Sequence, residues 1–239
     1  EDIVFLSFVG IRIILVHGGG PNISNRLKEM GIKPEFHNGI RVTDAQTLQV
    51  VIKELDEIND QIVKEQKSLG GDVTGLDGDE HIIHVEKKQS ERDLGYVGTI
   101  TNIEFKRLAR HVRKGRITVV APLGESIELQ PHNVNADEVA SAIASSMRAE
   151  KFVLLTDVPG VLRDPRDPKT LYSTLTVSEA LKLKKEGIVS GGMIPKVDSC
   201  LEALSGGLPK AHIIDASQEH ALLLEIFTDK GVGTQFIQG

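Results

Sequence analysis

Short runs of apolar residues recur along the chain between longer stretches of mixed polarity. Runs of this kind, bounded by glycine or polar residues, are typical of strands that are buried on both faces of a sheet. The predicted strands cover residues 11–16, 81–85, 96–100, 117–121, 152–155, 212–214 and 235–237.

The stretches between these runs carry apolar residues at helical spacing. In 43–69 the apolar residues fall on one side of a helix, for which Thr43 is a candidate N-cap. Strands separated by helices predict an α/β fold, a three-layer αβα sandwich with a central, mainly parallel sheet. The other predicted helices cover residues 22–30, 137–147 and 195–204, and residues 1–10 form the end of a further one.

Length and composition exclude several classes of protein. The 239 residues suffice for one large α/β domain or for two lobes that share a sheet. A net charge of −6, an aromatic content of 4% and the absence of tryptophan argue against a nucleic-acid-binding surface. Because no apolar run approaches roughly 18 residues, we expect no membrane span. The first ten residues carry no cleavage pattern, so we expect no signal peptide either. Cys200 is the single cysteine, so no internal disulfide can form, which favours a reducing compartment.

Glycine-rich turns precede two of the predicted helices. Residues 18–20 follow the strand 11–16, and their backbone N–H groups could approach an anion closely. Residues 191–192 precede a helix that carries Lys196 in its first turn. A lysine is unfavourable at the positive end of a helix, and a bound anion would compensate for it. The alternatives are a tight turn and a solvated lysine, and both stay open.

Polar residues gather at three other predicted boundaries. Asn133, Asn135 and Asp137 crowd one helix start, which is more than a single cap requires. Asp157 follows a predicted strand, at the edge where open α/β sheets bind ligands. Arg41 precedes a helix and offers a planar fork suited to a carboxylate. Each of these residues also has an ordinary interpretation, as a cap, a turn residue or a surface arginine.

Metal-binding patterns are absent from the sequence. The eight histidines show no ligand spacing, and only His17 beside the glycines stands out. We predict no protein metal ligands. Cys200 falls on the apolar side of a predicted helix, which indicates a packing role.

Five segments carry a resemblance to a known family. Each segment alone is weakly specific, but five in order, spread over nearly the whole chain, are strongly specific. The sequence resembles the acetylglutamate kinase branch of the amino acid kinase family. The segments are VHGGGPNI at 16–23, NGIRVTDA at 38–45, NVNAD at 133–137, LLTDVPGVL at 154–162 and SGGMIPKV at 190–197.

The resemblance implies a first lobe, residues 1–150, that binds acetylglutamate and makes oligomer contacts. Gly19 and Gly20 would hold the reacting carboxylate and the transferred phosphoryl group. Arg41 and Asn133 would bind the α-carboxylate end of the amino acid. In the same lobe, Asp137 would organise the catalytic lysines.

The resemblance also implies a second lobe, residues 151–239, that binds ATP and shares one continuous sheet with the first. Lys196 would stabilise the transferring phosphoryl group. The nucleotide would be lined by Thr156, Asp157, Val158, Gly160, Val161, Leu162, Ile188, Val189 and Ser190.

The implied reaction transfers the γ-phosphoryl group of ATP to the side-chain carboxylate of N-acetyl-L-glutamate, a step of arginine biosynthesis. A carboxylate with a pKa of about 4.3 is already ionised at neutral pH and needs no general base. The obstacle is repulsion between two anions, so positioning and charge neutralisation must supply the catalysis. Mg²⁺ would be held mainly by the nucleotide phosphates.

The sequence departs from the family at its start. The family opens with a strand ending in Lys-x-Gly-Gly, whose lysine is a second phosphoryl stabiliser. Either an upstream segment lies outside these residues, or the protein lacks that lysine and strand. We favour an upstream segment, because losing a strand would leave backbone groups of a buried sheet unpaired. Residues 75–79 and 124–133 are also shorter or altered relative to the family.

The C-terminal segment resembles the arginine-inhibited members of the family. This resemblance implies L-arginine as a feedback inhibitor, with His220, Glu225, Gly231 and Gly233 at its site. The alternative is that Leu222 and its neighbours simply pack a last helix. A homo-oligomer, dimer or hexamer, is also implied, in the cytoplasm or the plastid stroma, and a PII-type signalling protein is a further candidate partner.

Two other functions stay open. The chain could be an amino acid kinase for carbamate, aspartate, glutamate or a nucleotide, although NGIRVTDA together with NVNAD favours acetylglutamate. It could also be a catalytically inactive sensor of arginine or of a PII-type protein, which the missing Lys-x-Gly-Gly motivates. A dinucleotide-binding oxidoreductase is disfavoured because GxGxxG is absent.

Overall fold

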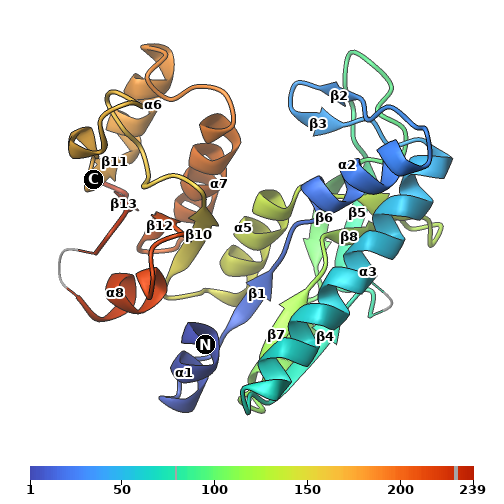
Figure 1. Cartoon of the computed structure of the whole chain (residues 1–239), viewed down its shortest axis with the longest axis horizontal. Coiled ribbons are helices and arrows are strands. Elements are labelled where there is room, and N and C mark those ends of the chain that lie inside the picture. The colour runs from blue at the N-terminus through green and yellow to red at the C-terminus, as the bar shows by residue number, and fades with distance from the viewer. Residues whose placement is uncertain (79, 229–230) are drawn as a thin grey trace. The chain divides into compact units, whose positions relative to one another are not determined.

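The computed structural model describes residues 1–78, 80–228 and 231–239 (Figure 1). Asp79 belongs to the turn that we expected to differ from the family, and it lies outside the described residues. None of the described helices is long and apolar enough to cross a membrane.

The chain divides into two compact units. One comprises Glu1 and residues 3–140, and the other comprises Asp2 and residues 141–239. The expected lobes, 1–150 and 151–239 on one continuous sheet, stay a prediction.

The larger share of the secondary structure lies before residue 148. A parallel three-stranded sheet, in the order β1-β7-β4, forms the centre of this part. In chain order the elements are α1 (Asp2–Phe8), β1 (Ile14–Val16), α2 (Gly20–Glu29), β2 (Phe36–His37), β3 (Ile40–Arg41), α3 (Ala45–Ser68), β4 (Val73–Leu76), β5 (Ile83–Lys87), β6 (Gly98–Ile103), α4 (Phe105–Val112), β7 (Ile117–Val120), β8 (Leu123–Glu125), β9 (Pro131–Asn133) and α5 (Ala136–Met147).

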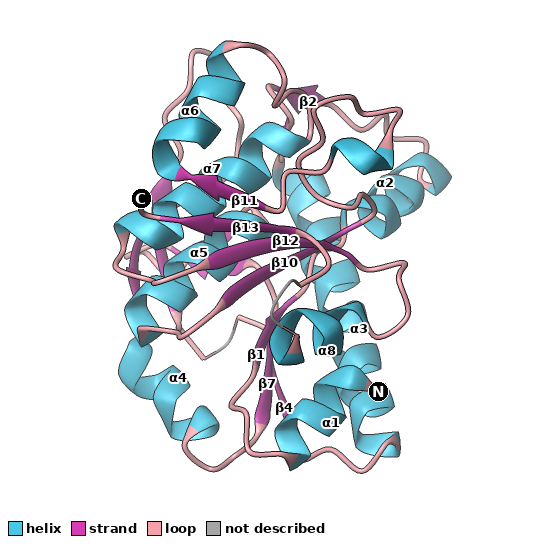
Figure 2. Ribbon diagram, turned by 90° about the vertical axis from the view of Figure 1, so that its left-hand side faces the viewer, coloured by secondary structure: helices cyan, strands magenta, loops and turns pink. Residues whose placement is uncertain are grey.

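Helices cover both faces of the β1-β7-β4 sheet. Figure 2 shows α3 and α4 on opposite sides of it, and both pack against β7. Ile117 and Val119 are fully buried, and they form a core with Val4 of α1 and Val73 of β4. This burial on both faces explains the continuous apolar run that predicted the strand.

Helix α3 begins one residue later than the sequence indicated. Its N-cap is Asp44, whose side chain accepts a hydrogen bond from the Thr47 amide at 2.7 Å. The prediction of Thr43 as the cap was wrong, because the Thr43 hydroxyl instead donates to the carbonyl oxygen of Arg41 at 3.0 Å. The hydrogen bond from the Thr47 amide lowers the pKa of Asp44.

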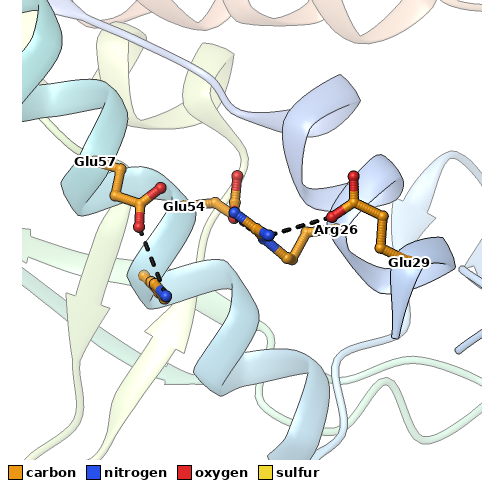
Figure 3. Close-up of polar contacts among 5 residues, drawn as sticks. Arg26, Glu29, Glu54 and Glu57 are labelled. Atoms are coloured by element: carbon orange, nitrogen blue, oxygen red, sulfur yellow. Dashed lines mark hydrogen bonds and ion pairs between the residues drawn. The ribbon is translucent and has the colours of Figure 1, made fainter. Parts of the chain in front are cut away.

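Arg26 joins helix α2 to helix α3 (Figure 3). Its Nε donates to Glu54 Oε1 at 2.8 Å, and its Nη1 donates to Glu29 Oε2 at 3.2 Å. Glu54 is buried on α3, so this ion pair is shielded from water on one side. Ile23 and Leu55 pack in one apolar cluster between the same helices. Together these contacts hold α2 against α3.

Two further sheets complete the first unit. Strands β6, β5, β8 and β9 form a four-stranded sheet in that order, and β2 pairs with β3 in a short hairpin. The strands predicted at 81–85 and 96–100 correspond to β5 and β6, shifted by about two residues. The pairs β2–β3 and β8–β9 were not predicted, because their strands are only two or three residues long.

The second unit contains a four-stranded sheet in the order β10-β12-β13-β11, whose strands lie side by side in Figure 2. Helix α7 packs on β10, β12 and β13, and α6 packs on β11. The elements are β10 (Phe152–Thr156), a 3₁₀ turn η1 (Pro168–Thr170), β11 (Thr174–Thr176), α6 (Val177–Lys185), α7 (Met193–Ser205), β12 (Ala211–Asp215), α8 (Ala221–Phe227) and β13 (Thr234–Ile237).

The α/β class predicted from the sequence is confirmed. The β1-β7-β4 sheet is parallel, whereas the sheet of the second unit is mixed, because its two middle strands, β12 and β13, pair antiparallel. Helix α6 was missed, although its capping box, Thr176 with Glu179, is readable as a T-x-x-E pattern. The helix expected from 195 is α7, and it begins two residues earlier, at Met193.

Candidate functional site

The turn between β1 and α2 is the first candidate anion site. Helix α2 begins at Gly20 with Gly19 as its N-cap, and no side chain among the described residues caps this start. The first N–H groups of an α-helix have no partner within the helix, so such a start suits an anion. A Cβ at Gly19 would lie 2.9 Å from Leu55 Cδ2 and 3.2 Å from Ile58 Cδ1. The turn therefore lies directly against α3, and a larger residue at Gly19 would require Leu55 and Ile58 to shift.

Arg41, at the end of β3, is a buried cation beside this turn. Its Nη2 donates to the carbonyl oxygen of Gly20 at 3.0 Å and to Ser24 Oγ at 2.9 Å. The guanidinium carbon lies 4.8 Å from the centre of the Phe36 ring. Nη1 is buried and has no hydrogen-bond partner among the described residues, and burial lowers the pKa of the side chain. An unpaired charged donor in a buried position is costly, and a bound carboxylate would satisfy it.

Asn133 is connected to Arg41 through Thr43. Its Nδ2 donates to Thr43 Oγ1 at 3.1 Å, and Thr43 Oγ1 donates to the Arg41 carbonyl oxygen at 3.0 Å. The backbone amide of Asn133 also donates to the Tyr96 carbonyl oxygen at 2.9 Å. The structure thus brings together Gly20, Arg41 and Asn133, which the sequence had assigned to one ligand.

The polar residues at the start of helix α5 differ in their hydrogen bonds. Asn135 is the cap, because its Oδ1 accepts from the amides of Asp137 at 2.8 Å and Glu138 at 3.1 Å. Glu138 also pairs with Lys88 Nζ at 3.1 Å. Asn135 therefore caps the helix, and Asp137 is an acidic residue of its first turn.

The second unit contains a pocket of about 390 Å³ beyond the carboxyl end of β10. Ligands of open α/β sheets occupy this kind of position. Of the nine residues assigned to the nucleotide, Val189 is the exception, since it is buried in the core rather than lining the pocket. The lining residues are Thr156, Asp157, Val158, Gly160, Val161, Leu162, Pro165, Ile188, Ser190, Gly192, Met193 and Lys196.

One wall of this pocket is fixed by Thr234 of β13. Thr234 is fully buried, and its Oγ1 accepts a hydrogen bond from the Val161 amide at 2.8 Å. Gly160 has a φ of 141°, and a Cβ there would lie 2.5 Å from Thr234 Oγ1. The glycine therefore permits both the backbone conformation and the close approach of β13.

Lys196 lines the same pocket from helix α7. It is the fourth residue of a helix whose N-cap is Gly192. The first turn of α7 carries no acidic residue, so an anion in the pocket would complement both the lysine and the helix start. An ion pair between Lys184 of α6 and Asp198 of α7 holds the two helices together.

Comparison with known proteins identifies the family. The amino acid kinase family matches residues 1–215 of the chain. The chain belongs to the amino acid kinase family. The resemblance found in the sequence is confirmed.

Relatives of this amino acid kinase carry more specific names. Acetylglutamate kinase from Desulforamulus reducens is 44% identical over 239 residues, covering 99% of this chain and 83% of the relative. N-acetylglutamate synthase from Neisseria gonorrhoeae, complexed with coenzyme A and N-acetyl-glutamate, has a TM-score of 0.89 and 26% identity, over 100% of this chain and 55% of the synthase. The synthase complexed with coenzyme A and L-arginine has a TM-score of 0.85 and 25% identity, over 100% and 56%. The chain therefore spans about half the length of the synthase.

The third candidate site of this amino acid kinase is the one assigned to arginine, and it contains Glu225. Its Oε1 lies 2.5 Å from His212 Nδ1, and its Oε2 accepts from the Val232 amide at 2.8 Å. Lys151 Nζ donates to its backbone carbonyl oxygen at 3.1 Å. Burial alone would raise the pKa of Glu225, but these hydrogen bonds and the charges of His212 and Lys151 lower it below its usual value. The buried carboxylate is therefore ionised at neutral pH.

Of the other residues assigned to arginine, Gly231 lies against Glu225. Gly231 has a φ of 61°, and a Cβ there would come within 2.5 Å of the Glu225 carboxylate. Gly233 instead lies against the Ile213 backbone. His220 is the N-cap of α8, and its Nδ1 lies 2.7 Å from Asp2 Oδ1.

Four residues that contact these sites were not predicted as site residues. Ser24 is a short hydroxyl residue in an ordinary helix position, and nothing in the sequence distinguished it. Thr43 was considered only as a helix cap, not as a residue of the site. His212 carried a signal, since it is a histidine within an otherwise apolar strand. Lys151 precedes β10 and carried none.

Proposed function

We propose that the protein transfers the γ-phosphoryl group of ATP to the side-chain carboxylate of N-acetyl-L-glutamate, the activity named for its relatives. The observation that carries this proposal is Arg41, a buried guanidinium with an unpaired Nη1 whose Nη2 binds Gly20. A substrate with one carboxylate for Arg41 and a second for the glycine turn satisfies both groups.

The residues that bind the acceptor substrate have two roles in this proposal. Arg41 and Asn133 bind the α-carboxylate end of N-acetylglutamate, supported by the hydrogen bond that links Asn133 to Thr43. Gly19 and Gly20 receive the reacting carboxylate and the transferred phosphoryl group on their N–H groups. Asp137, in the first turn of α5, orients the cationic groups of the reaction.

The nucleotide occupies the pocket of about 390 Å³ in the second unit. This volume falls within the range of roughly 300–1,000 Å³ that is usual for small-molecule sites. The mixed apolar and polar lining, with Lys196 at one end of α7, suits a base and sugar followed by phosphates. Val189 supports the wall from the core.

Positioning and charge neutralisation supply the catalysis. The acceptor carboxylate is ionised at neutral pH, so no group has to remove a proton from it. Lys196 and the N–H groups of the glycine turn offset the negative charge that gathers as the two anions approach. No group of three or more His, Cys, Asp or Glu within 1–78, 80–228 and 231–239 could hold a metal ion. We treat Mg²⁺ as part of the substrate, a complex held by the nucleotide phosphates.

L-Arginine is the feedback inhibitor in this proposal. The buried, ionised carboxylate of Glu225 offers a partner for a guanidinium. The likeness to a synthase that was complexed with L-arginine supports the same ligand. His220 and Gly233, assigned to this site from the sequence, stay candidates beside Glu225 and Gly231.

Assembly and location complete the proposal. A homo-oligomer, a dimer or a hexamer, is implied by the family, and a PII-type protein is a candidate partner. We propose the cytoplasm or plastid stroma as the compartment, which agrees with a single cysteine that is buried.

The test is ATP-dependent acyl-phosphate formation, trapped as the hydroxamate. N-acetylglutamate is compared with glutamate, aspartate and carbamate, on the wild type and on Lys196→Ala. Turnover of N-acetylglutamate that collapses in Lys196→Ala is the expected result. A folded protein that binds ATP or arginine and turns over no acceptor would refute the kinase and favour a catalytically inactive sensor.

A further inference from the structure

Asn59 has a buried side-chain amide, and none of the roles above has been assigned to it. It lies on α3, one residue after Ile58, which packs against the glycine turn, and it is 3% exposed. Its Nδ2 lies 3.2 Å from His17 Nε2, 3.4 Å from the Val119 carbonyl oxygen and 3.5 Å from the Leu76 carbonyl oxygen. One side chain thus contacts the ends of β4 and β7 and the residue that follows β1.

The neighbours of Asn59 determine which way its amide points. The two backbone carbonyl oxygens can only accept hydrogen bonds, so the NH₂ group must face them. Nε2 of His17 lies on the same side and therefore acts as an acceptor. His17 Nδ1 then carries the ring proton, and it donates to the Gly18 carbonyl oxygen 3.2 Å away. Burial also lowers the pKa of His17, which agrees with a neutral ring.

Glycine in β4 makes this contact possible. A Cβ at Gly75 would overlap the amide oxygen of Asn59 and would lie 3.1 Å from Val63 Cγ2. Gly75 therefore allows α3 to approach the sheet closely enough for the amide to reach the strand ends. Leu55 and Ile58 limit the space at Gly19 in the same way.

We propose that Asn59 is a positioning residue of the phosphoryl-transfer site: acting through the Nδ1–H tautomer of His17, it holds the 18–20 turn in the conformation that receives the reacting groups. The inference rests on the proposed function of that turn. Asn59 lies under the turn and not at the reacting atoms. A turn displaced by about 1 Å can cost up to about a hundredfold in rate, because the hydrogen bonds must match the transition state.

The decisive variant is Asn59→Asp, which keeps the size of the side chain and removes its two N–H donors. We expect kcat to fall by about tenfold to a hundredfold, with KM for N-acetylglutamate changed less than about threefold. Gly75→Ala should have the same effect while retaining the amide, because it displaces Asn59. Gln61→Glu makes the matched change on the exposed side of α3, and its kcat should equal that of the wild type.

Nitrogen NMR of the full chain labelled at histidine tests the tautomer without relying on turnover. The expected spectrum shows Nδ1 protonated and Nε2 bare for His17 in the wild type, and a changed pattern in Asn59→Asp. The amide resonances of residues 18–20 should move in Asn59→Asp and Gly75→Ala but not in Gln61→Glu.

The outcomes separate the inference from the proposed function. An active wild type whose kcat is unaffected by Asn59→Asp, or a His17 ring protonated at Nε2, overturns the inference. A wild type that turns over no acceptor refutes the proposed function, and the amide resonances of residues 18–20 then still decide whether Asn59 positions the turn.

Discussion

Arg41 donates a hydrogen bond from Nη2 to the carbonyl oxygen of Gly20 at 3.0 Å. This bond joins the residue proposed for one end of the acceptor to the turn proposed for the other end. Because Nη2 also binds Ser24 in the first turns of α2, the guanidinium and the turn form one connected group. Such a group favours an acceptor whose two carboxylates have a fixed separation.

Replacing Arg41 by lysine should weaken the binding of N-acetylglutamate. Lysine keeps the charge but loses the planar fork and the bonds to Gly20 and Ser24. Hydrogen bonds to charged groups contribute about 1.5–3 kcal/mol, so we expect KM for N-acetylglutamate to rise by at least about tenfold. Steady-state kinetics with each substrate varied in turn would measure this.

The control for this variant is Arg26→Lys, which alters another arginine of the same unit. Arg26 binds Glu54 and Glu29 and not the turn, so KM for N-acetylglutamate should stay near the wild-type value. Equal increases of KM in both variants would contradict the role of Arg41.

Lys196→Ala should abolish most of the turnover while leaving the nucleotide bound. The lysine contributes charge in the transition state, and removal of one such group typically costs about a hundred- to a thousandfold in kcat. The remaining lining of the pocket should keep the dissociation constant of ATP within a few-fold, as measured by calorimetry. Lys185→Ala, an exposed change on α6, is the matched control. A loss of ATP binding equal to the loss of kcat would assign Lys196 to ground-state binding instead.

The sequence predicted those parts of the molecule that stand at boundaries between strands and helices. Gly19, Arg41, Asn133 and Lys196 all lie there, and their roles were assigned through the resemblance to the family, which rests on five segments in order. Asn59 gave no such signal, because a single amide within a helical pattern looks like any polar residue until its neighbours are known. Its acceptors come from three separate strand ends, and only the folded chain brings these together.

The helices and strands likewise divide into those that the sequence predicted and those that only the folded chain shows. The long apolar run of β7 predicted a buried strand, and Ile117 is fully buried. The strands β8 and β9 are three residues each, too short for alternation to be recognised. Thr43 and Asp44 are both good caps by residue type, and only the hydrogen bond from Thr47 distinguishes them.

Asp44→Ala should destabilise the first unit without changing the site chemistry. Loss of an N-cap typically lowers the free energy of unfolding by about 1 kcal/mol, within a range of roughly 0.5–2 kcal/mol. Asp44→Ser, which can accept the same bond from Thr47, should retain most of the stability. Urea unfolding followed by circular dichroism would compare the two, and equal stabilities for the alanine and serine variants would argue against the cap.

Glu225→Gln should abolish the response to arginine while activity remains. Glutamine keeps the size of the side chain but removes the charge that we propose for the guanidinium. Arginine should raise the melting temperature and inhibit the wild type, and it should do neither in the variant. Glu219→Gln, at an exposed carboxylate, should behave as the wild type. Arginine that leaves both activity and melting temperature of the wild type unchanged would refute the site.

His17 should make the stability of the protein depend on pH below its usual pKa. Burial lowers the pKa of His17 below 6.5 in the folded state, so between that lowered value and 6.5 the unfolded chain binds more protons. The free energy of unfolding therefore rises with pH through this window, and the contribution is complete above pH 6.5. Glu225, whose folded pKa lies below 4.5, acts in a more acidic window, where stability falls as pH drops. Urea unfolding of the wild type and of His17→Gln, from about pH 5 to about pH 8, isolates the contribution of His17, because the free energy of unfolding should rise less with pH in the variant. Identical slopes would mean that His17 titrates alike in the folded and unfolded chains.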